Sequence, residues 1–210
     1  MTSFMADAPI LFIDRGDMPS LAALAVQADH DRIVLWHLVE PDPAAQQRRA
    51  VIDRHARMWG IDHVLITEDP AIGVSGLVVP TGPLDALILV QAAVIAHQIG
   101  GRQVIWPRCV GPDGENVAGE MDRAASVCEL IEMDGTAGPL DIEAPVIDLT
   151  DTQLVDLVQD SGACSGAFWP CVEGDRDPCQ QCPECQRWAV AISAMGLSWP
   201  WIEADRATAE

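Results

Sequence analysis

Four cysteines lie close together near the C-terminus of this chain, at Cys171, Cys179, Cys182 and Cys185. Their spacing, C-x7-C-x2-C-x2-C, allows four thiolates to converge on one metal ion. Two disulfides among such near neighbours would be strained, because a disulfide needs a defined Cβ separation and dihedral angle. The pattern therefore favours zinc, with an iron–sulfur cluster and unligated thiols as the alternatives. Cys164 is the one rival of Cys171 for a ligand position.

A closed shell of four sulfurs leaves no position for water, so we expect a structural zinc and not a catalytic one. Four thiolates around a divalent ion leave an excess of negative charge. Arg176 and Arg187 flank the cysteines and are expected to donate hydrogen bonds to the sulfurs. Pro183 is expected to start a helix whose N-terminal amides point at the cluster. The metal would then fasten this helix to the loop that follows Gly162.

The charge of the chain excludes several classes of function. Its 210 residues carry a net charge of -20, and all 12 basic residues are arginine. Such a field repels nucleic acid, because duplex binding needs clustered cations that displace counterions. No apolar run approaches the ~18–20 residues of a membrane span. The N-terminus lacks the features of a secretory signal, so the seven cysteines indicate a reducing, cytoplasmic location.

Strand-like and helix-like segments alternate through the first half of the chain. The expected strands are 8–13, 32–38, 63–67 and 103–106, and the expected helices are 20–28, 43–58 and 84–99. Strands separated by helices of this length predict βαβ units and a parallel, Rossmann-like sheet. Ligands of such sheets bind beyond the C-terminal ends of the strands, so the residues that follow each strand are the candidate site.

The second half has a different pattern. We expect a polar loop at 111–119, a helix at 120–131, an extended segment at 142–150 and helices at 150–158 and 186–195. Thr150 or Asp151 is the expected N-cap of the first short helix, and Gly196 is expected to end the last one. The predicted organisation is an α/β domain over 1–135 and a helical portion with the cysteine loop over 136–210, packed together as one unit.

Three stretches resemble the 7-cyano-7-deazaguanine synthase family (QueC/ExsB), a group of ATP pyrophosphatase-type enzymes of queuosine biosynthesis. They are IEAPVIDLTDTQLVDLVQDSG at 142–162, FWPC-x7-C-x2-C-x2-C-x-RW at 168–188 and VPTGPLDALILVQAAVIAHQIG at 79–100. The second is similar to the family's four-cysteine zinc loop, although its first gap is one residue shorter than the family's. The resemblance implies an adenine nucleotide alpha hydrolase-like (PP-loop) sheet with a C-terminal zinc portion. It also implies a dimer, and conversion of 7-carboxy-7-deazaguanine, ammonia and ATP to the nitrile.

The chain departs from this family at the phosphate loop. The family has Ser-Gly-Gly-x-Asp-Ser after its first strand, where this chain has the candidate loop residues Asp14, Arg15, Gly16, Asp17 and Ser20. Two carboxylates are expected to face the phosphate volume, and a like charge at ~4 Å costs about 1–4 kcal/mol. A proline in the loop also removes a backbone donor. We therefore expect ATP and magnesium binding to be lost; the alternatives are an ATP-competent loop in which Arg15 grips phosphate, and an ordinary capped turn.

Other features support the same expectation. Residues 80–83 (PTGP) lack the arginine and asparagine of the family loop, and Trp106 either fills the space of a nucleotide base or packs in the core. The histidines are interpreted as structural. Trp199 and Trp201 are candidates for a partner surface.

The sequence thus predicts a zinc-binding, QueC-like protein of deazapurine biosynthesis with lost or altered ATP-pyrophosphatase activity. The alternative is an active ATP-dependent deazapurine ligase. Expected partners are a small deazapurine or nucleotide ligand, and a second copy or another protein.

Overall fold

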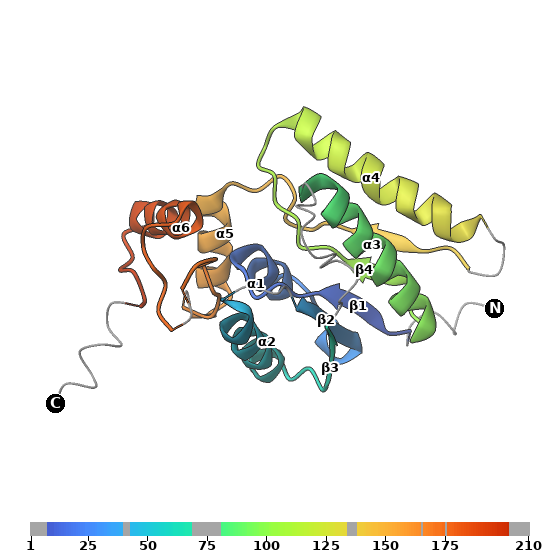
Figure 1. Cartoon of the computed structure of the whole chain (residues 1–210), viewed down its shortest axis with the longest axis horizontal. Coiled ribbons are helices and arrows are strands. Elements are labelled where there is room, and N and C mark those ends of the chain that lie inside the picture. The colour runs from blue at the N-terminus through green and yellow to red at the C-terminus, as the bar shows by residue number, and fades with distance from the viewer. Residues whose placement is uncertain are drawn as a thin grey trace.

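The computed structural model describes residues 8–39, 43–68, 81–133, 138–164, 166–174 and 176–201. Its centre is a five-stranded parallel sheet in the order β3-β2-β1-β4-β5 (Figure 1). The strands are β1 (Ile10–Ile13), β2 (Ile33–Val39), β3 (His63–Glu68), β4 (Gln103–Ile105) and β5 (Asp141–Glu143). All four strand pairs are parallel. The Rossmann-like α/β fold predicted from the alternating pattern is confirmed.

The strand order reverses beside β1. The chain runs from β1 through β2 to β3 on one side and then crosses to β4 and β5 on the other. Such a switch point leaves a crevice outside the carboxyl ends of the two strands that flank it. Here those strands are β1 and β4, and Phe12 pairs with Ile105 across them.

Alternate residues of β1 pack into two separate hydrophobic clusters, as the two-residue period of a strand requires. Ile10 and Phe12 lie in the cluster that helices α1, α2, α5 and α6 cover. Leu11 and Ile13 lie in the cluster beneath α3 and α4. All four residues are buried, which explains why β1 is a continuous apolar run without alternation.

The helices form a layer on each face of the sheet. They are α1 (Met18–Ala25), α2 (Ala45–Trp59), α3 (Thr81–Gln98), α4 (Gly114–Glu132), α5 (Asp151–Asp160) and α6 (Pro183–Ala194). Figure 1 shows α3 and α4 side by side, with α5 and α6 grouped at the opposite end of the molecule. One core cluster contains Phe12 of β1, Leu154 of α5 and Trp188 of α6. The C-terminal helices therefore share a core with the sheet.

Most helix ends follow from capping groups visible in the sequence. Asp17 caps α1, and Thr150 caps α5 in a capping box that Gln153 completes. Gly60 ends α2 at φ 64°, a left-handed conformation that favours glycine.

Three expected boundaries were wrong. The loop predicted for 111–119 ends at Asp113, whose side chain accepts a hydrogen bond from the Glu115 amide and starts α4 early. The helix α3 already begins at Thr81, because proline is tolerated in a first turn; Pro80 lies outside the described residues. Of the extended segment predicted at 142–150, only Ile142 and Glu143 pair with the sheet, in a fifth strand that begins at Asp141 and was not predicted.

Within the described residues, no helix combines the length and the apolar character needed to cross a membrane.

Candidate functional site

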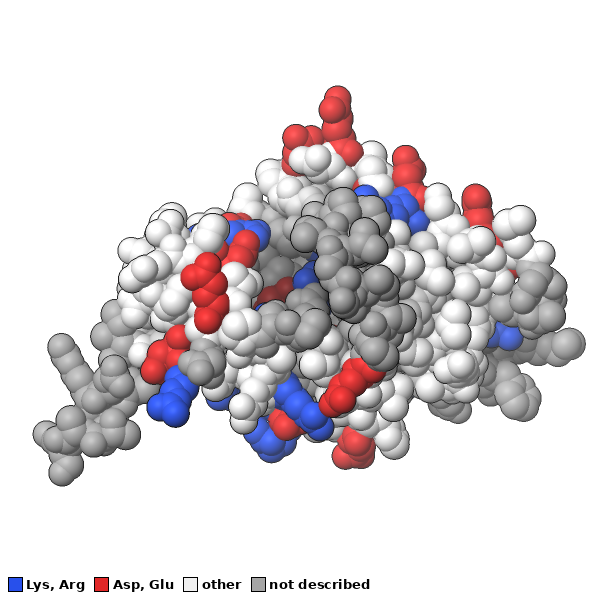
Figure 2. Space-filling model, in the orientation of Figure 1, with Lys and Arg blue, Asp and Glu red and all other residues white. Residues whose placement is uncertain are grey.

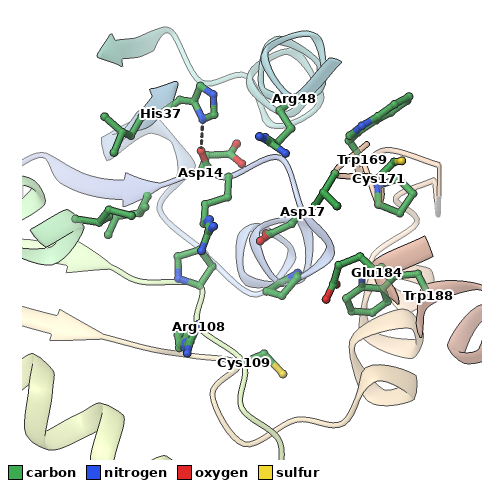
Figure 3. Close-up of a pocket in the computed structure, with 18 of the residues that line it drawn as sticks. Asp14, Asp17, His37, Arg48, Arg108, Cys109, Trp169, Cys171, Glu184 and Trp188 are labelled. Carbon is green, nitrogen blue, oxygen red and sulfur yellow. Dashed lines mark hydrogen bonds between the residues drawn. The ribbon is translucent and has the colours of Figure 1, made fainter. Parts of the chain in front are cut away.

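A cavity of about 410 Å³ opens at the carboxyl ends of β1, β2 and β4 (Figure 3). The sheet side contributes Asp14, His37, Trp106 and Arg108. The opposite wall comes from the cysteine-rich region and α6, through residues that include Trp169, Cys171, Glu184, Arg187 and Trp188. The cavity thus lies at the switch point of the sheet, where the sequence pattern predicted a ligand site.

The β1–α1 loop forms the floor of this cavity. Gly16 adopts φ 69°, and its amide donates a 2.8 Å hydrogen bond to Oδ1 of Asp14. The amide of Arg15 donates to Oγ of Ser20 at 3.1 Å. These two backbone donors of the loop are therefore satisfied by side chains of the loop itself.

Asp17 occupies the N-cap of α1. Its Oδ1 accepts from the amide of Ser20 at 2.9 Å and from the hydroxyl of Ser20 at 2.6 Å. This is the ordinary capped strand–helix turn that the sequence left open as an alternative. The five predicted loop residues thus lie together, but the hydrogen bonds described here join them to one another.

Asp14 forms a buried ion pair with His55 of α2. Neither side chain has exposed surface, and Oδ2 of Asp14 lies 2.8 Å from Nδ1 of His55. Nε2 of His55 lies 2.7 Å from the carbonyl oxygen of Ala167. Both ring nitrogens face acceptors, so the imidazole donates from both only when it is protonated.

The pKa of His55 reflects these contacts. Burial disfavours the charged ring, but the charge and hydrogen bond of Asp14 and the carbonyl of Ala167 outweigh it and raise the pKa above 6.5. Asp14 and Asp17, the two carboxylates expected to face the phosphate volume, both line the cavity, but the sequence did not predict that the charge of Asp14 is paired with His55. The interpretation of His55 as a structural histidine agrees with these contacts, although its pairing with Asp14 was not predicted. His55 follows Val51 and Ile52 on the buried stripe of α2, and that spacing was the available signal.

The same loop is joined to the segment that leads into the cysteines. The amide of Trp169 donates to the carbonyl of Gly16 at 2.8 Å. Nη1 of Arg54 donates to the carbonyl of Gly166 at 2.9 Å. Together with the contact from His55 to Ala167, these bonds hold the β1–α1 loop, α2 and the segment before Cys171 in one arrangement.

Several arginines line the cavity, of which only Arg15 was predicted from the sequence to lie at the ligand site. Four of the 12 basic residues line it: Arg15, Arg48, Arg108 and Arg187. Figure 3 shows Arg48 extending from α2 toward the β1–α1 loop. No sequence spacing links these residues, because each comes from a different element.

Ion pairs orient one of these guanidinium groups. Nη1 of Arg108 lies 3.2 Å from Asp85, and its Nη2 lies 3.0 Å from Glu120. Arg15 lies 3.8 Å from the same Asp85. Asp85 is buried at the start of α3, so this network fixes the edge of the cavity.

The predicted tryptophan positions differ in outcome. Trp106 is 5% exposed and belongs to the core beneath α3 and α4, yet it also lines the cavity. Trp199 and Trp201 pack against the other core, and Trp201 contacts Phe168 edge to face at 5.2 Å. Both residues are partly buried, and their role in a partner surface stays a prediction.

The four cysteines of the sequence motif form one cluster. Their Sγ atoms all lie within 4.8 Å of one another, and Cys171, Cys182 and Cys185 are buried. A tetrahedron of sulfurs ~2.3 Å from a zinc ion has edges of about 3.8 Å, so the donor set fits a metal ion. Cys164 is exposed and lies outside the cluster, which agrees with the choice of Cys171.

Backbone amides surround these sulfurs. Sγ of Cys171 accepts from the amides of Gly174 at 3.0 Å and Cys179 at 3.3 Å. Burial would raise the pKa of Cys171, but these bonds outweigh it and lower the pKa to about 7. At Cys185, burial and the neighbouring thiols raise the pKa instead. The cluster therefore contains one thiol that ionises readily and one that a metal must deprotonate.

The start of α6 faces the cluster as predicted. Helix α6 begins at Pro183, and Cys182 is its N-cap, with Sγ accepting from the amide of Cys185 at 3.5 Å. The expectation that Arg187 donates to the sulfurs was wrong. Its guanidinium binds both oxygens of Asp151, at 2.8 and 2.6 Å, because this carboxylate at the start of α5 offers bidentate geometry.

A family comparison assigns the chain. The model of the family described as "Queuosine biosynthesis protein QueC" matches residues 83–196, more than half of the 210 residues. The chain belongs to the QueC family. The matched region includes most of α3, all of β4, α4 and β5, and all four clustered cysteines. It begins after the β1–α1 loop, so the match does not extend to the phosphate-loop position.

Solved structures show more distant similarity. A U34-tRNA thiolase NcsA from Methanococcus maripaludis, described with its 4Fe–4S cluster, is 9% identical with a TM-score of 0.49. The alignment covers 90% of this chain but only 66% of the thiolase. An NMN synthetase from Francisella tularensis is 14% identical with a TM-score of 0.49, over 94% of this chain and 82% of the synthetase. No curated protein matches the sequence.

We predict that His55→Gln destabilises the protein most at low pH. A raised pKa in the folded state gives stability that is complete below the unfolded value of 6.5 and is lost as pH rises through the folded pKa. Breaking a buried pair costs roughly 3–5 kcal/mol, so we expect a deficit of that size near pH 6 and a smaller one near pH 9. Urea unfolding at both pH values measures it. The exposed His63→Gln serves as control, and an equal deficit at both pH values would contradict the prediction.

We also predict that removal of the metal loosens the C-terminal helices. Metal binding at such a site contributes about 10–16 kcal/mol of apparent free energy, which becomes folding energy. A strong chelator, or Cys182→Ser, should lower the thermal midpoint and reduce the near-UV circular dichroism of the tryptophans, of which Trp169 and Trp201 pack with the cysteines. Cys164→Ser should retain full metal content. An unchanged melting curve after complete chelation would refute a structural metal.

Proposed function

We propose that this QueC-family chain has lost ATP-pyrophosphatase activity and retains its cavity as a binding site for a small deazapurine or nucleotide-like ligand. One observation carries the proposal: the amide of Gly16, which a phosphate would need, donates to the chain's own Asp14 at 2.8 Å. The amide of Arg15 is likewise taken by Ser20. Side chains of the loop already satisfy these two donors, so a phosphate must displace them.

Guanidinium groups in the cavity wall can bind an anionic group of a ligand. Four of the 12 arginines of the chain line the cavity, together with the carboxylates of Asp14, Asp17 and Glu184. Arg108 and Arg187 also form ion pairs with Asp85 and Asp151, so part of their positive charge is already balanced within the protein. Trp106 and Trp188 also contribute to the cavity wall, although both side chains are almost completely buried.

The alternative is an ATP-dependent deazapurine ligase with a rewired loop. It is favoured by Arg15 and Arg48, which line the cavity beside the β1–α1 loop. Guanidinium groups bind phosphate in bidentate fashion and can replace backbone amides. Calorimetric titration with Mg-ATP distinguishes the two proposals, because only the rewired loop is expected to bind it.

For the cysteine cluster we propose a structural zinc. Four sulfur donors form a closed shell around zinc, and the donors here come from one loop and one helix start. An iron–sulfur cluster uses the same ligands, but it absorbs visible light, so a colourless sample with one zinc per chain distinguishes the two. We also propose a cytoplasmic location, because a reducing compartment keeps thiols available as metal ligands.

We predict that Mg-ATP produces no binding heat at millimolar concentration, and that no AMP or pyrophosphate is released from it. Isothermal titration and product analysis on zinc-loaded protein test this, with a screen of 7-deazaguanine derivatives on the same sample. Binding heat together with release of AMP or pyrophosphate, both lost in Arg15→Gln and kept in the exposed Arg57→Gln, would support the rewired ligase instead.

We further propose that the partner protein is a second copy, docked through the outer face of α3. Asp85 is the only charged residue among Asp, Glu, Lys and Arg in this helix, and it is buried. Leu87 and Val94, seven residues apart and therefore on one face, are 52% and 42% exposed. Figure 2 shows a broad white area over the C-terminal part of α3, with acidic residues along α4 beside it. Two copies of a strongly acidic chain can meet at such an uncharged stripe without burying like charges.

Accordingly, Leu87→Glu with Val94→Glu should convert a dimer into a monomer, because it places like charges on both sides of the contact. Sedimentation equilibrium measures the change. Val190→Glu is the matched control, since Val190 is 71% exposed on α6, away from α3. A wild-type monomer at high protein concentration would refute the dimer.

A further inference from the structure

We propose that Glu173 is the residue through which metal ions enter and leave the cysteine cluster, as a transient ligand that passes the ion to Cys179. The inference rests on the metal proposed for this cluster and concerns how the ion reaches it. It names a carboxylate as a fifth donor beside the four sulfurs, where the sequence pattern predicts sulfur donors alone.

The four cysteines of the cluster differ in their exposure. Cys171, Cys182 and Cys185 are 1%, 2% and 0% exposed, whereas Cys179 is only partly buried. A metal ion cannot pass through close-packed side chains without displacing them. The ion therefore meets the cluster first at Cys179, in the loop that precedes α6.

Glu173 lies beside this accessible cysteine. It is exposed, and its Oε2 lies 4.0 Å from Sγ of Cys179. A zinc ion ~2.3 Å from a thiolate and ~2.1 Å from a carboxylate oxygen holds these two donors about 3.6 Å apart in tetrahedral geometry. The observed separation is close to this value, so a small movement of the side chain lets one ion bind Glu173 and Cys179 at the same time.

The fold of the loop keeps this carboxylate next to the sulfurs. Glu173 lies two residues after Cys171, and the next amide, that of Gly174, donates to Sγ of Cys171 at 3.0 Å. A Cβ on Gly174 would clash with the carbonyl oxygen of Asp177, so the loop folds tightly back on itself at this point. Glu173 is thereby placed between Cys171, which precedes it in the chain, and Cys179, which it contacts.

The chemistry of the donors makes Glu173 a transient ligand. Thiolates suit zinc better than carboxylate oxygens do, so transfer of the ion from Glu173 to the sulfurs is favourable. Four thiolates around a divalent ion leave an excess of negative charge, which repels the carboxylate once the ion has reached the sulfurs. Glu173 therefore attracts the incoming cation and is released when the cluster is complete.

The test follows metal exchange on the folded, zinc-loaded protein. Excess cadmium replaces the bound zinc, and the ultraviolet charge-transfer absorption of the cadmium–thiolate bonds records the rate. We expect Glu173→Gln to slow this exchange roughly fivefold, as the attraction between a carboxylate and a cation at ~4 Å in water implies. The equilibrium affinity for zinc, measured by competition with a chelator, should change by less than about twofold, because a transient ligand speeds entry and exit alike.

A matched control separates this contact from the charge of the loop as a whole. Asp177→Asn removes one carboxylate from another exposed position of the same loop and should exchange metal at the wild-type rate. The thermal midpoint of zinc-loaded Glu173→Gln should equal that of wild type, since Glu173 is exposed. A merely structural role for Glu173 would instead lower the midpoint and the zinc affinity, and zinc would be lost faster.

The failure of this inference and the failure of the proposed metal give different results. If Glu173→Gln exchanges metal as fast as wild type, or if Asp177→Asn is slowed equally, Glu173 is not the entry ligand and the proposed metal stands. If Glu173→Gln binds zinc more weakly and loses it faster, Glu173 supports the bound state, and the entry role is refuted. If the wild-type protein binds neither zinc nor cadmium, both proposals are overturned.

Discussion

The buried contact between Asp14 and His55 joins three segments that are far apart in the sequence. Asp14 ends β1, His55 lies on the inner face of α2, and His55 reaches on to Ala167 in the segment before the cysteines. Within the interior a charge persists only when it is paired and hydrogen-bonded. The pair therefore fixes the positions of the β1–α1 loop, of α2 and of the segment before the cysteine cluster relative to one another.

This arrangement gives the cysteine cluster a role beyond its own loop. Trp169 hydrogen-bonds the carbonyl of Gly16, and Cys171, two residues later, is both a cluster member and part of the cavity wall. The cysteine cluster and the candidate ligand site therefore share Cys171. The structural zinc that we propose would perform no chemistry in a closed shell of four sulfurs, but it would hold this part of the cavity wall in place.

Much of the fold and one half of the site could be predicted from the sequence. Buried apolar runs such as Ile10–Ile13 identify parallel strands, and the spacing of the cysteines identifies their cluster, because both signals are local. The cavity arginines could not be found in this way. Arg48 and Arg108 belong to different elements, and only the packing of α2 and the end of β4 around the sheet brings them to one cavity.

The sequence by itself determined the α/β architecture, the four-cysteine cluster and an altered phosphate-loop position, since each depends on residue type and short spacing. Tertiary structure alone decided what the altered loop does. From the sequence, Asp14 and Asp17 were expected to be two charges that repel phosphate. In the structure, Asp14 pairs with His55 and Asp17 caps the N-terminus of α1. The physical reason is that the state of a buried carboxylate depends on the partner that packing places beside it, and here that partner is 41 residues away along the chain.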